Sequence, residues 1–345
     1  MKALFLKEKG VLSPGEFDDP DIMGPDDVRI KIHRVGICGS DLHYFRHGRL
    51  GKYVVKEPLI LGHEASGEVI EIGENVTDLK PGDRVCMEPG VPDPKSKAYR
   101  LGVYNLDLTM RFWSAPPDHG ALRESVVHPA AFTYKLPENV SYGEGALVEP
   151  LAVGVHAAKK AEIQLGDIAL VIGAGTIGAV TTLAALAGGC SRVILADIVQ
   201  EKLDVVSKFG PIVPVNVKEQ NLVDVVLDLT DGWGANIIFE ASGSQSAASM
   251  ILDPLCPGGR ILYIGVPEKP VPIDMAYAIY KEARIQTVRT YAHVFPRALA
   301  LMESGTLDLK PLITDTYPFS DSIKAFEYAN NPRPTSIKVQ IVMDI

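Results

Sequence analysis

The chain has 345 residues, of which 46% are hydrophobic and 22% charged, a length and composition typical of a globular protein of about two domains. A chain of this length can bury enough apolar surface to fold without disulfides, which excludes a disulfide-rich mini-protein, a fibrous repeat and a disordered tail. Its 34 basic and 43 acidic residues give a net charge of -9. We therefore expect no nucleic-acid partner, because such partners select basic surfaces.

We also expect no membrane partner, because no window approaches about 18 uninterrupted apolar residues. The N-terminal apolar run, within Met1–Lys7, is too short for the core of a signal peptide. The four cysteines are widely scattered: Cys38, Cys86, Cys190 and Cys256. Without a secretion signal, this usage predicts free thiols and a cytoplasmic protein.

The first 140 or so residues are predicted to be rich in β-structure. Residues 28–32 alternate apolar and polar side chains, as a half-buried strand does. Similar short runs predict strands at 67–72, 84–87 and 132–136. Residues 89–117 show no clear period and predict a long surface loop.

After residue 143 the pattern predicts an α/β fold. A stretch of helical length over 146–161 is followed by alternating strands and helices. Strands are expected at 168–172, 193–196, 212–215, 237–240, 261–264 and 285–288, and helices at 175–188, 200–209, 222–230 and 245–255. Near-continuous apolar strands alternating with helices indicate a doubly wound parallel sheet. The tail beyond 290 predicts two helices and a strand near 339–343 that pack on the first domain. The predicted domains are 1–150 with 290–345, and 151–289.

A dinucleotide site is predicted at the first turn of this α/β region. The motif Gly173-Ala-Gly175-Thr176-Ile177-Gly178 follows a strand and opens a helix, which lets a pyrophosphate approach the backbone at the helix N-terminus. Asp197 ends the next strand, where a carboxylate can bond the ribose 2′-hydroxyl. A carboxylate repels a 2′-phosphate, and no Arg follows Asp197 closely. We therefore predict that these residues bind NAD rather than NADP.

A metal site is suggested by Cys38 and by His63-Glu64, which follow it by 25 and 26 residues. Zinc takes thiolate, imidazole and carboxylate ligands, and a catalytic zinc site leaves one position open. Each residue alone has a simpler explanation, since a single Cys is usually a small buried hydrophobe. Spacing alone therefore leaves the metal site as one of two interpretations.

The segment Gly62-His63-Glu64-Ala-Ser-Gly67, with Gly73 and Val76 after it, resembles the zinc-site signature of medium-chain dehydrogenases. The upstream Cys38-Gly-Ser-Asp and the downstream glycine motif stand where that family has them. The resemblance covers essentially the whole chain and is closest to the sorbitol and xylitol dehydrogenase branch, through 38–44, 102–105, 116–117 and 145–151. It implies a GroES-like β-rich catalytic domain, a Rossmann domain, a catalytic zinc and NAD.

The resemblance also implies a role for individual residues. Cys38, His63 and Glu64 would hold zinc, Glu64 either directly or through water, and Asp41 would orient the His63 imidazole. Glu149 would lie against the open position and a substrate hydroxyl. Ser40 and His43 stand at the positions of a proton relay. The substrate pocket would be lined by Tyr44, Phe112, Glu149 and Tyr291.

Two departures from the family pattern matter. Many relatives hold a structural zinc with four closely spaced cysteines, but residues 90–112 contain none, so we predict one zinc per chain. Sorbitol enzymes commonly carry Arg directly before the tyrosine at 291, and Thr290 stands there instead. This second departure bears on the substrate and not on the class of reaction.

The resemblance implies oxidation of a polyol, xylitol or sorbitol, to a ketose by hydride transfer to NAD. One alternative keeps the machinery for another secondary alcohol: L-arabinitol, L-threonine, butanediol or a sugar acid. The other is a non-catalytic dinucleotide-binding protein, which would not need zinc ligands and a relay together. The family commonly assembles through an edge of the nucleotide-binding sheet, which predicts a homotetramer, or else a dimer, using the apolar segment Val271–Ala283.

Overall fold

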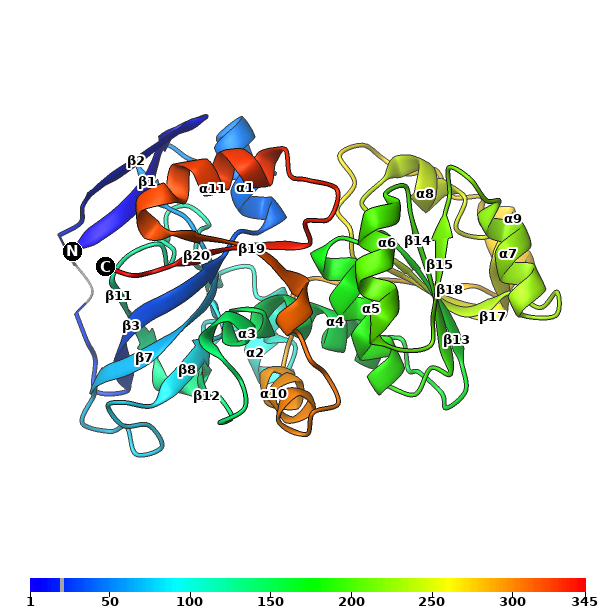
Figure 1. The fold of residues 1–345 in the computed structure, drawn as a ribbon. Helices are drawn as coiled ribbons and strands as arrows, with labels where there is room; N and C mark the ends of the chain where they lie inside the picture. The colour runs from blue at the N-terminus through cyan, green and yellow to red at the C-terminus, as the bar shows by residue number, and fades with distance from the viewer. Residues whose placement is uncertain (19–21) are drawn as a thin grey trace. The chain divides into compact units, whose positions relative to one another are not determined.

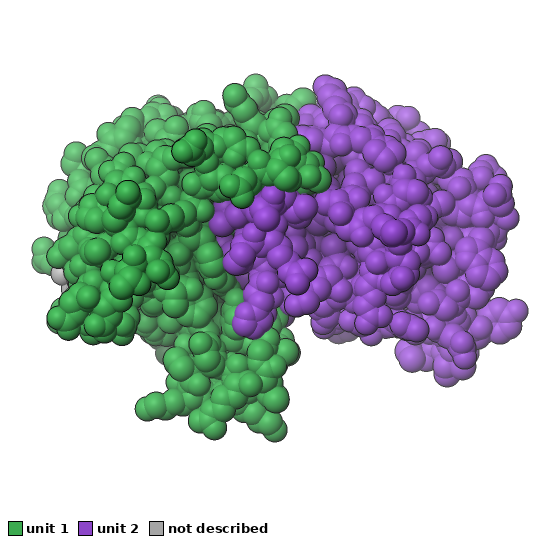
Figure 2. Space-filling view, turned by 90° about the horizontal axis from the view of Figure 1, so that it is seen from below, with its two compact units in different colours: residues 1–149, 302–345 green, residues 150–301 purple. Residues whose placement is uncertain are grey.

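The computed structural model describes residues 1–18 and 22–345, which form two compact units. Unit 1 comprises residues 1–149 and 302–345, and unit 2 comprises residues 150–301 (Figure 2). The chain therefore returns to unit 1 at residue 302, twelve residues later than the sequence pattern placed the boundary. The difference arises at helix α10 (Phe295–Glu303), whose Ala300 and Leu301 line a cavity together with residues of other helices in unit 2.

Unit 1 is built on a seven-stranded sheet in the order β12-β8-β7-β3-β20-β19, with β11 also paired to β3. The bounds are β3 (Asp27–Gly36), β7 (Glu64–Ile72), β8 (Arg84–Met87), β11 (Ser125–Pro129), β12 (Thr133–Lys135), β19 (Ile313–Pro318) and β20 (Lys338–Val342). Strands β3 and β20 come from opposite ends of the chain and pair antiparallel (Figure 1). The predicted return of the tail to the first domain is thus seen for residues 302–345, together with strand β19, which the sequence pattern did not indicate.

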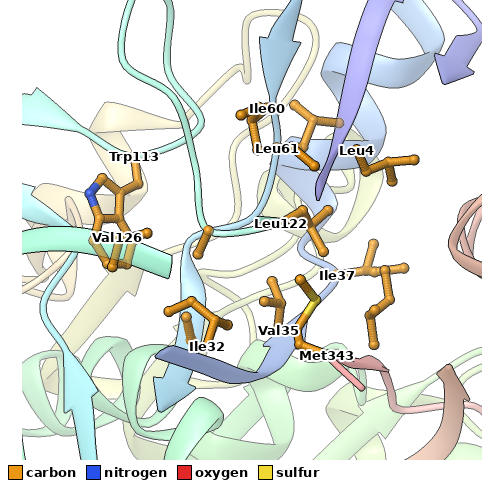
Figure 3. Close-up of a cluster of buried hydrophobic side chains, with 14 of the residues drawn as sticks. Leu4, Ile32, Val35, Ile37, Ile60, Leu61, Trp113, Leu122, Val126 and Met343 are labelled. Atoms are coloured by element: carbon orange, nitrogen blue, oxygen red, sulfur yellow. The ribbon is translucent and has the colours of Figure 1, made fainter. Parts of the chain in front are cut away.

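A second sheet in unit 1 has the order β2-β1-β6. Its strands are β1 (Lys2–Glu8), β2 (Val11–Glu16) and β6 (Leu59–Ile60), and the helices of unit 1 include α1 (Gly39–His47), α2 (Lys97–Arg100), α3 (Tyr142–Ala146) and α11 (Ser322–Asn330). The alternation predicted for residues 28–32 holds, because Val28, Ile30 and Ile32 are buried. They join a core in which Leu4, Leu61 and Leu122 converge between the sheets (Figure 3). Burying each such side chain stabilises the fold by about 1.5–3 kcal/mol.

The segment expected as a long loop over 89–117 contains short elements: β9 (Gly90–Val91), α2, a 3₁₀ turn at Tyr104–Leu106, and β10 (Arg111–Phe112). Asp107 organises it. Its carboxylate accepts hydrogen bonds from the backbone N–H groups of Asp93 and Thr109, at 2.9 Å each, and from the Thr109 hydroxyl at 2.8 Å. A buried carboxylate therefore holds this segment together.

Unit 2 is a six-stranded parallel sheet in the order β15-β14-β13-β16-β17-β18, which confirms the doubly wound fold. The strands are β13 (Ile168–Ile172), β14 (Arg192–Asp197), β15 (Ile212–Asn216), β16 (Ala235–Glu240), β17 (Leu255–Tyr263) and β18 (Arg284–Thr287). The helices are α4 (Val148–Lys160, beginning in unit 1), α5 (Thr176–Ala187), α6 (Gln200–Val206), α7 (Leu222–Leu229), α8 (Gln245–Ser249) and α9 (Met275–Tyr280). The helix expected over 245–255 is shorter, because β17 begins at residue 255. In the described part of the chain, no helix has the length and apolar character needed to cross a membrane.

Candidate active site

Three side chains able to bind a metal gather at one end of the main sheet of unit 1. The Cys38 Sγ, a ring nitrogen of His63 and a carboxylate oxygen of Glu64 all lie within 4.8 Å of one another. Cys38 lies two residues beyond β3 and immediately before α1, while Glu64 opens β7 opposite Gly36. The pairing of β3 with β7 therefore brings together candidate ligands that are 25 and 26 residues apart in the sequence.

Asp41 connects the segments that carry these side chains. Its fully buried carboxylate accepts hydrogen bonds from Cys38 N at 3.1 Å, Gly62 N at 3.2 Å and the Ser114 hydroxyl at 2.6 Å. Burial favours the neutral carboxyl, but His63 and these donors outweigh burial and hold the pKa of Asp41 below its usual value. Asp41 is therefore an ionised group, and its Oδ1 lies 3.5 Å from His63 Nδ1.

The groups around His63 favour a positive charge at its ring. Burial disfavours a charged imidazole, but the negative charges of Asp41 and Cys38 outweigh burial and raise the pKa of His63. His63 Nδ1 is buried and has no hydrogen-bond partner among the described residues, because 3.5 Å to Asp41 is long for such a bond. Thiolate, imidazole and carboxylate are the donors that zinc prefers, so these residues fit a zinc ion.

The other residues expected near the metal in unit 1 lie on two helices and a short strand. Tyr44 is buried on α1, where burial and the nearby Asp41 raise its pKa to about 12, so that its phenol stays neutral. Ser40 and His43 lie on the same helix and are partly exposed. The Phe112 ring lies 5.6 Å from the His63 ring. Glu149 is buried at the start of α4.

Sequence reasoning missed Lys338, which opens strand β20. Its ammonium is buried and donates to both Glu64 oxygens, at 2.8 and 2.7 Å, and to the Ile37 carbonyl at 3.1 Å. A signal was present, because a Lys inside the run Ile337–Val342, in which Gln340 is the other polar residue, is unusual for a buried strand. The partner, in contrast, is 274 residues away in the sequence.

Glu88 was also missed. Its carboxylate is buried after β8 and accepts hydrogen bonds from the hydroxyls of Tyr104, at 2.7 Å, and Tyr134, at 3.2 Å. Burial, aided by the negative charge of Glu149, raises the pKa of Glu88 to about 7 despite these two donors. Glu88 is therefore a buried acid within electrostatic range of Glu149.

The glycine turn of unit 2 has the geometry of a dinucleotide site. Gly178 packs so closely on the turn that an added Cβ would overlap the carbonyl oxygen of Gly173, whereas Gly175 faces open space. Thr176 and Ile177 begin helix α5. Asp197 accepts hydrogen bonds from Ala174 N at 2.6 Å and Val199 N at 2.9 Å. The predicted carboxylate therefore lies beside the turn.

Tyr291, the remaining predicted substrate residue, belongs to unit 2 and is buried with its ring 5.3 Å from that of Phe295. Thr290, which stands where the sorbitol branch commonly has Arg, has φ = 46°. This left-handed conformation is uncommon for a β-branched residue and marks a strained backbone. The role of Tyr291 remains a prediction.

Comparisons with known proteins agree with this geometry. The family model for the alcohol dehydrogenase GroES-like domain matches residues 24–138, and that for zinc-binding dehydrogenases matches residues 176–304. D-xylulose reductase of Morganella morganii is 52% identical over 96% of this chain and 98% of its own. Sorbitol dehydrogenase of Mus musculus is 38% identical over 93% of this chain and 90% of its own. The crystal structure of 2R,3R-butanediol dehydrogenase from Bacillus subtilis matches with a TM-score of 0.91 and 29% identity, over 99% of both chains.

Proposed function

This chain belongs to the zinc-dependent medium-chain dehydrogenase family and is an oxidoreductase, and we propose that it oxidises a secondary hydroxyl of xylitol or sorbitol to the ketose, with NAD as acceptor. The observation that carries the proposal is the cluster of the partly buried Cys38 with the buried His63 and Glu64. Relatives named for D-xylulose and sorbitol support the choice of a polyol. A non-catalytic dinucleotide-binding protein would not need such a cluster.

Each part of the chemistry has residues suited to it. Zinc held by Cys38, His63 and Glu64 supplies Lewis acidity, which makes a substrate hydroxyl a stronger acid. Ser40 and His43, partly exposed on α1, carry the released proton towards solvent. NAD supplies the hydride acceptor, and the protein holds and orients it.

The polar groups of unit 1 suit a substrate with several hydroxyls. The Glu149 carboxylate accepts a hydrogen bond from a second substrate hydroxyl, while the neutral Tyr44 phenol donates one. A site built to hydrogen-bond substrate hydroxyls discriminates against analogues that lack them. Ethanol and other simple alcohols are therefore expected to be poor substrates.

NAD is proposed over NADP because the Asp197 carboxylate lies beside the glycine turn. One zinc per chain is proposed because residues 90–112 contain no cysteine and Asp107 ties that segment together with hydrogen bonds. The four cysteines are free thiols, which supports a cytoplasmic location.

A homotetramer, or else a dimer, is proposed from the surface of α9. Its Met275, Ile279 and Tyr280 are 58%, 72% and 85% exposed. They lie within the apolar segment 271–283, which precedes the edge strand β18 of the six-stranded sheet. Clustered apolar side chains beside an open sheet edge favour association with another subunit.

The test is initial rates of NAD reduction by the zinc-loaded protein with xylitol, sorbitol, L-arabinitol, L-threonine, 2,3-butanediol and ethanol, with zinc content measured on the same sample. We expect xylitol or sorbitol to be fastest, with one zinc per chain. Faster turnover of butanediol or ethanol than of every polyol would overturn the substrate proposal. A zinc-loaded protein inactive on all of them would overturn the proposed reaction.

A further inference from the structure

The pair formed by Lys338 and Glu64 lies across the end of three neighbouring strands. Strand β3 runs between β7, which Glu64 opens, and β20, which Lys338 opens. The register pairs Gly36 with Glu64 on one side and with Gln340 on the other. Glu64 must therefore extend across β3 to reach Lys338.

Gly36 leaves the space for this crossing. A Cβ added at Gly36 would overlap the Glu64 carboxylate oxygen Oε2 and would come within 3.1 Å of the Glu64 Cβ. Any side chain at this position would push Glu64 away from its present place. The backbone of β3 is thus shaped to let Glu64 contact Lys338.

The ammonium is held in this place by several groups. Lys338 is 3% exposed and Glu64 1%, so water competes little for either charge. Besides the two Glu64 oxygens, Lys338 donates to the Ile37 carbonyl, and Ile37 N in turn donates to the Val339 carbonyl at 3.0 Å. Cys38 and Glu149 also interact electrostatically with the ammonium. Lys338 is therefore a fixed charge beside the metal ligands.

A zinc ion with one thiolate and one carboxylate is formally neutral with its ligands. A fixed ammonium that occupies both oxygens of that carboxylate changes this balance in two ways. It competes with the metal for the carboxylate electrons, and it repels the dication. Without the ammonium, the buried Glu64 carboxylate would have no charge partner, so it would bind a metal cation more tightly.

Building on the zinc site of the proposed function, we propose that Lys338 is a positioning residue that shares Glu64 with the metal and thereby weakens zinc binding. Lys338 holds Glu64 in place when zinc is absent and lowers the negative charge that the ligands present when zinc is bound. Glu64 would then hold a bound zinc ion more weakly than Cys38 and His63 do.

The test compares the zinc affinity of the full-length protein and its variants at pH 8, by competition with a chromogenic chelator, and their melting temperatures with and without zinc. Lys338→Met is expected to bind zinc at least about tenfold more tightly and to melt earlier than wild type when zinc-free. Lys338→Arg, which keeps the charge, should bind zinc within about threefold of wild type. A purely structural role for Lys338 would instead predict weaker zinc binding in Lys338→Met.

The double variant Glu64→Gln with Lys338→Met gives a second measurement, because it removes both charges together. Glu64→Gln alone should weaken zinc binding strongly, since it leaves an unpaired ammonium beside the metal, and adding Lys338→Met should restore at least tenfold of that loss. Unchanged or weaker zinc binding by Lys338→Met would overturn this inference and leave the proposed function standing. Additive effects of the two substitutions in the double variant would do the same. A wild-type chain that binds no zinc would overturn the proposed function with it.

Discussion

Asp197→Asn tests whether a single carboxylate sets the preference for NAD. The side chain ends β14 and accepts hydrogen bonds from Ala174 N at 2.6 Å and Val199 N at 2.9 Å. An Asn amide has the same shape and keeps one accepting oxygen, so it retains one of these two bonds. The substitution removes the negative charge with little change in the turn, at an expected cost of about 1 kcal/mol in the free energy of unfolding.

The magnitude follows from two contributions. A carboxylate about 4 Å from a negative charge of a 2′-phosphate repels it by about 4 kcal/mol at an effective dielectric constant of 20. Asp197 is only partly buried, so screening by solvent reduces this to roughly 2 kcal/mol. Loss of a charged acceptor for the ribose hydroxyl costs about 1 kcal/mol more for NAD. The ratio of kcat/KM for NAD over NADP should therefore fall by about 100-fold.

The assay measures kcat/KM for both cofactors with the best polyol at saturation. The matched control is Asp228→Asn, which removes one negative charge from an exposed position on α7, outside the glycine turn. Its ratio should equal that of the wild type. A change of less than threefold in folded Asp197→Asn protein would refute the assignment of cofactor preference to this carboxylate.

Three further outcomes are expected. Ser114→Ala removes the 2.6 Å hydrogen bond to Asp41 and should weaken zinc binding by about tenfold in a chelator competition, and an unchanged affinity would contradict the orienting role of Asp41. The hydrogen bonds that Asp107 accepts outweigh burial and lower the pKa of its carboxyl to about 2. The carboxylate therefore stabilises the fold above about pH 4, and this stabilisation is lost as the pH falls towards 2. The melting temperature of Asp107→Asn should hence lie below that of wild type at pH 6 and approach it at pH 3, and a constant gap would count against this. Ile279→Glu should reduce the mass measured by light scattering to a smaller assembly, while an unchanged mass would place the interface elsewhere.

Much of unit 2 could be predicted because its signals are local. Apolar runs mark the buried parallel strands, and the glycine turn lies between a strand and the helix that it begins. Asp197 follows the turn by one strand, so its position needed only the order of elements. The helix expected over 245–255 was too long, because the segment after Ser249 turns into β17 and apolar periodicity does not mark such an end.

Unit 1 was less predictable because its contacts join distant segments. Residues 89–117 have no regular period, and a hydrogen-bond network around Asp107 orders them instead. Cys38 and His63 were suggested by residue type and spacing, and only the family resemblance turned them into a predicted site. The hydroxyl of Ser114 reaches Asp41 across 73 residues, a contact that no spacing rule anticipates.

Lys338 shows most clearly why the charge of the site could not be obtained from the sequence. The candidate ligands Cys38, His63 and Glu64 alone suggest a neutral zinc complex, because one thiolate and one carboxylate would balance the charge of the ion. The antiparallel pairing of β20 with β3 then brings a residue from the end of the chain to the ligand segment, with Ile37 N bonded to the Val339 carbonyl. A strand register thus adds a positive charge to the site, and Gly36 lets Glu64 meet it. The charge of the candidate metal site therefore depends on the strand that carries Lys338 as much as on the candidate ligands themselves.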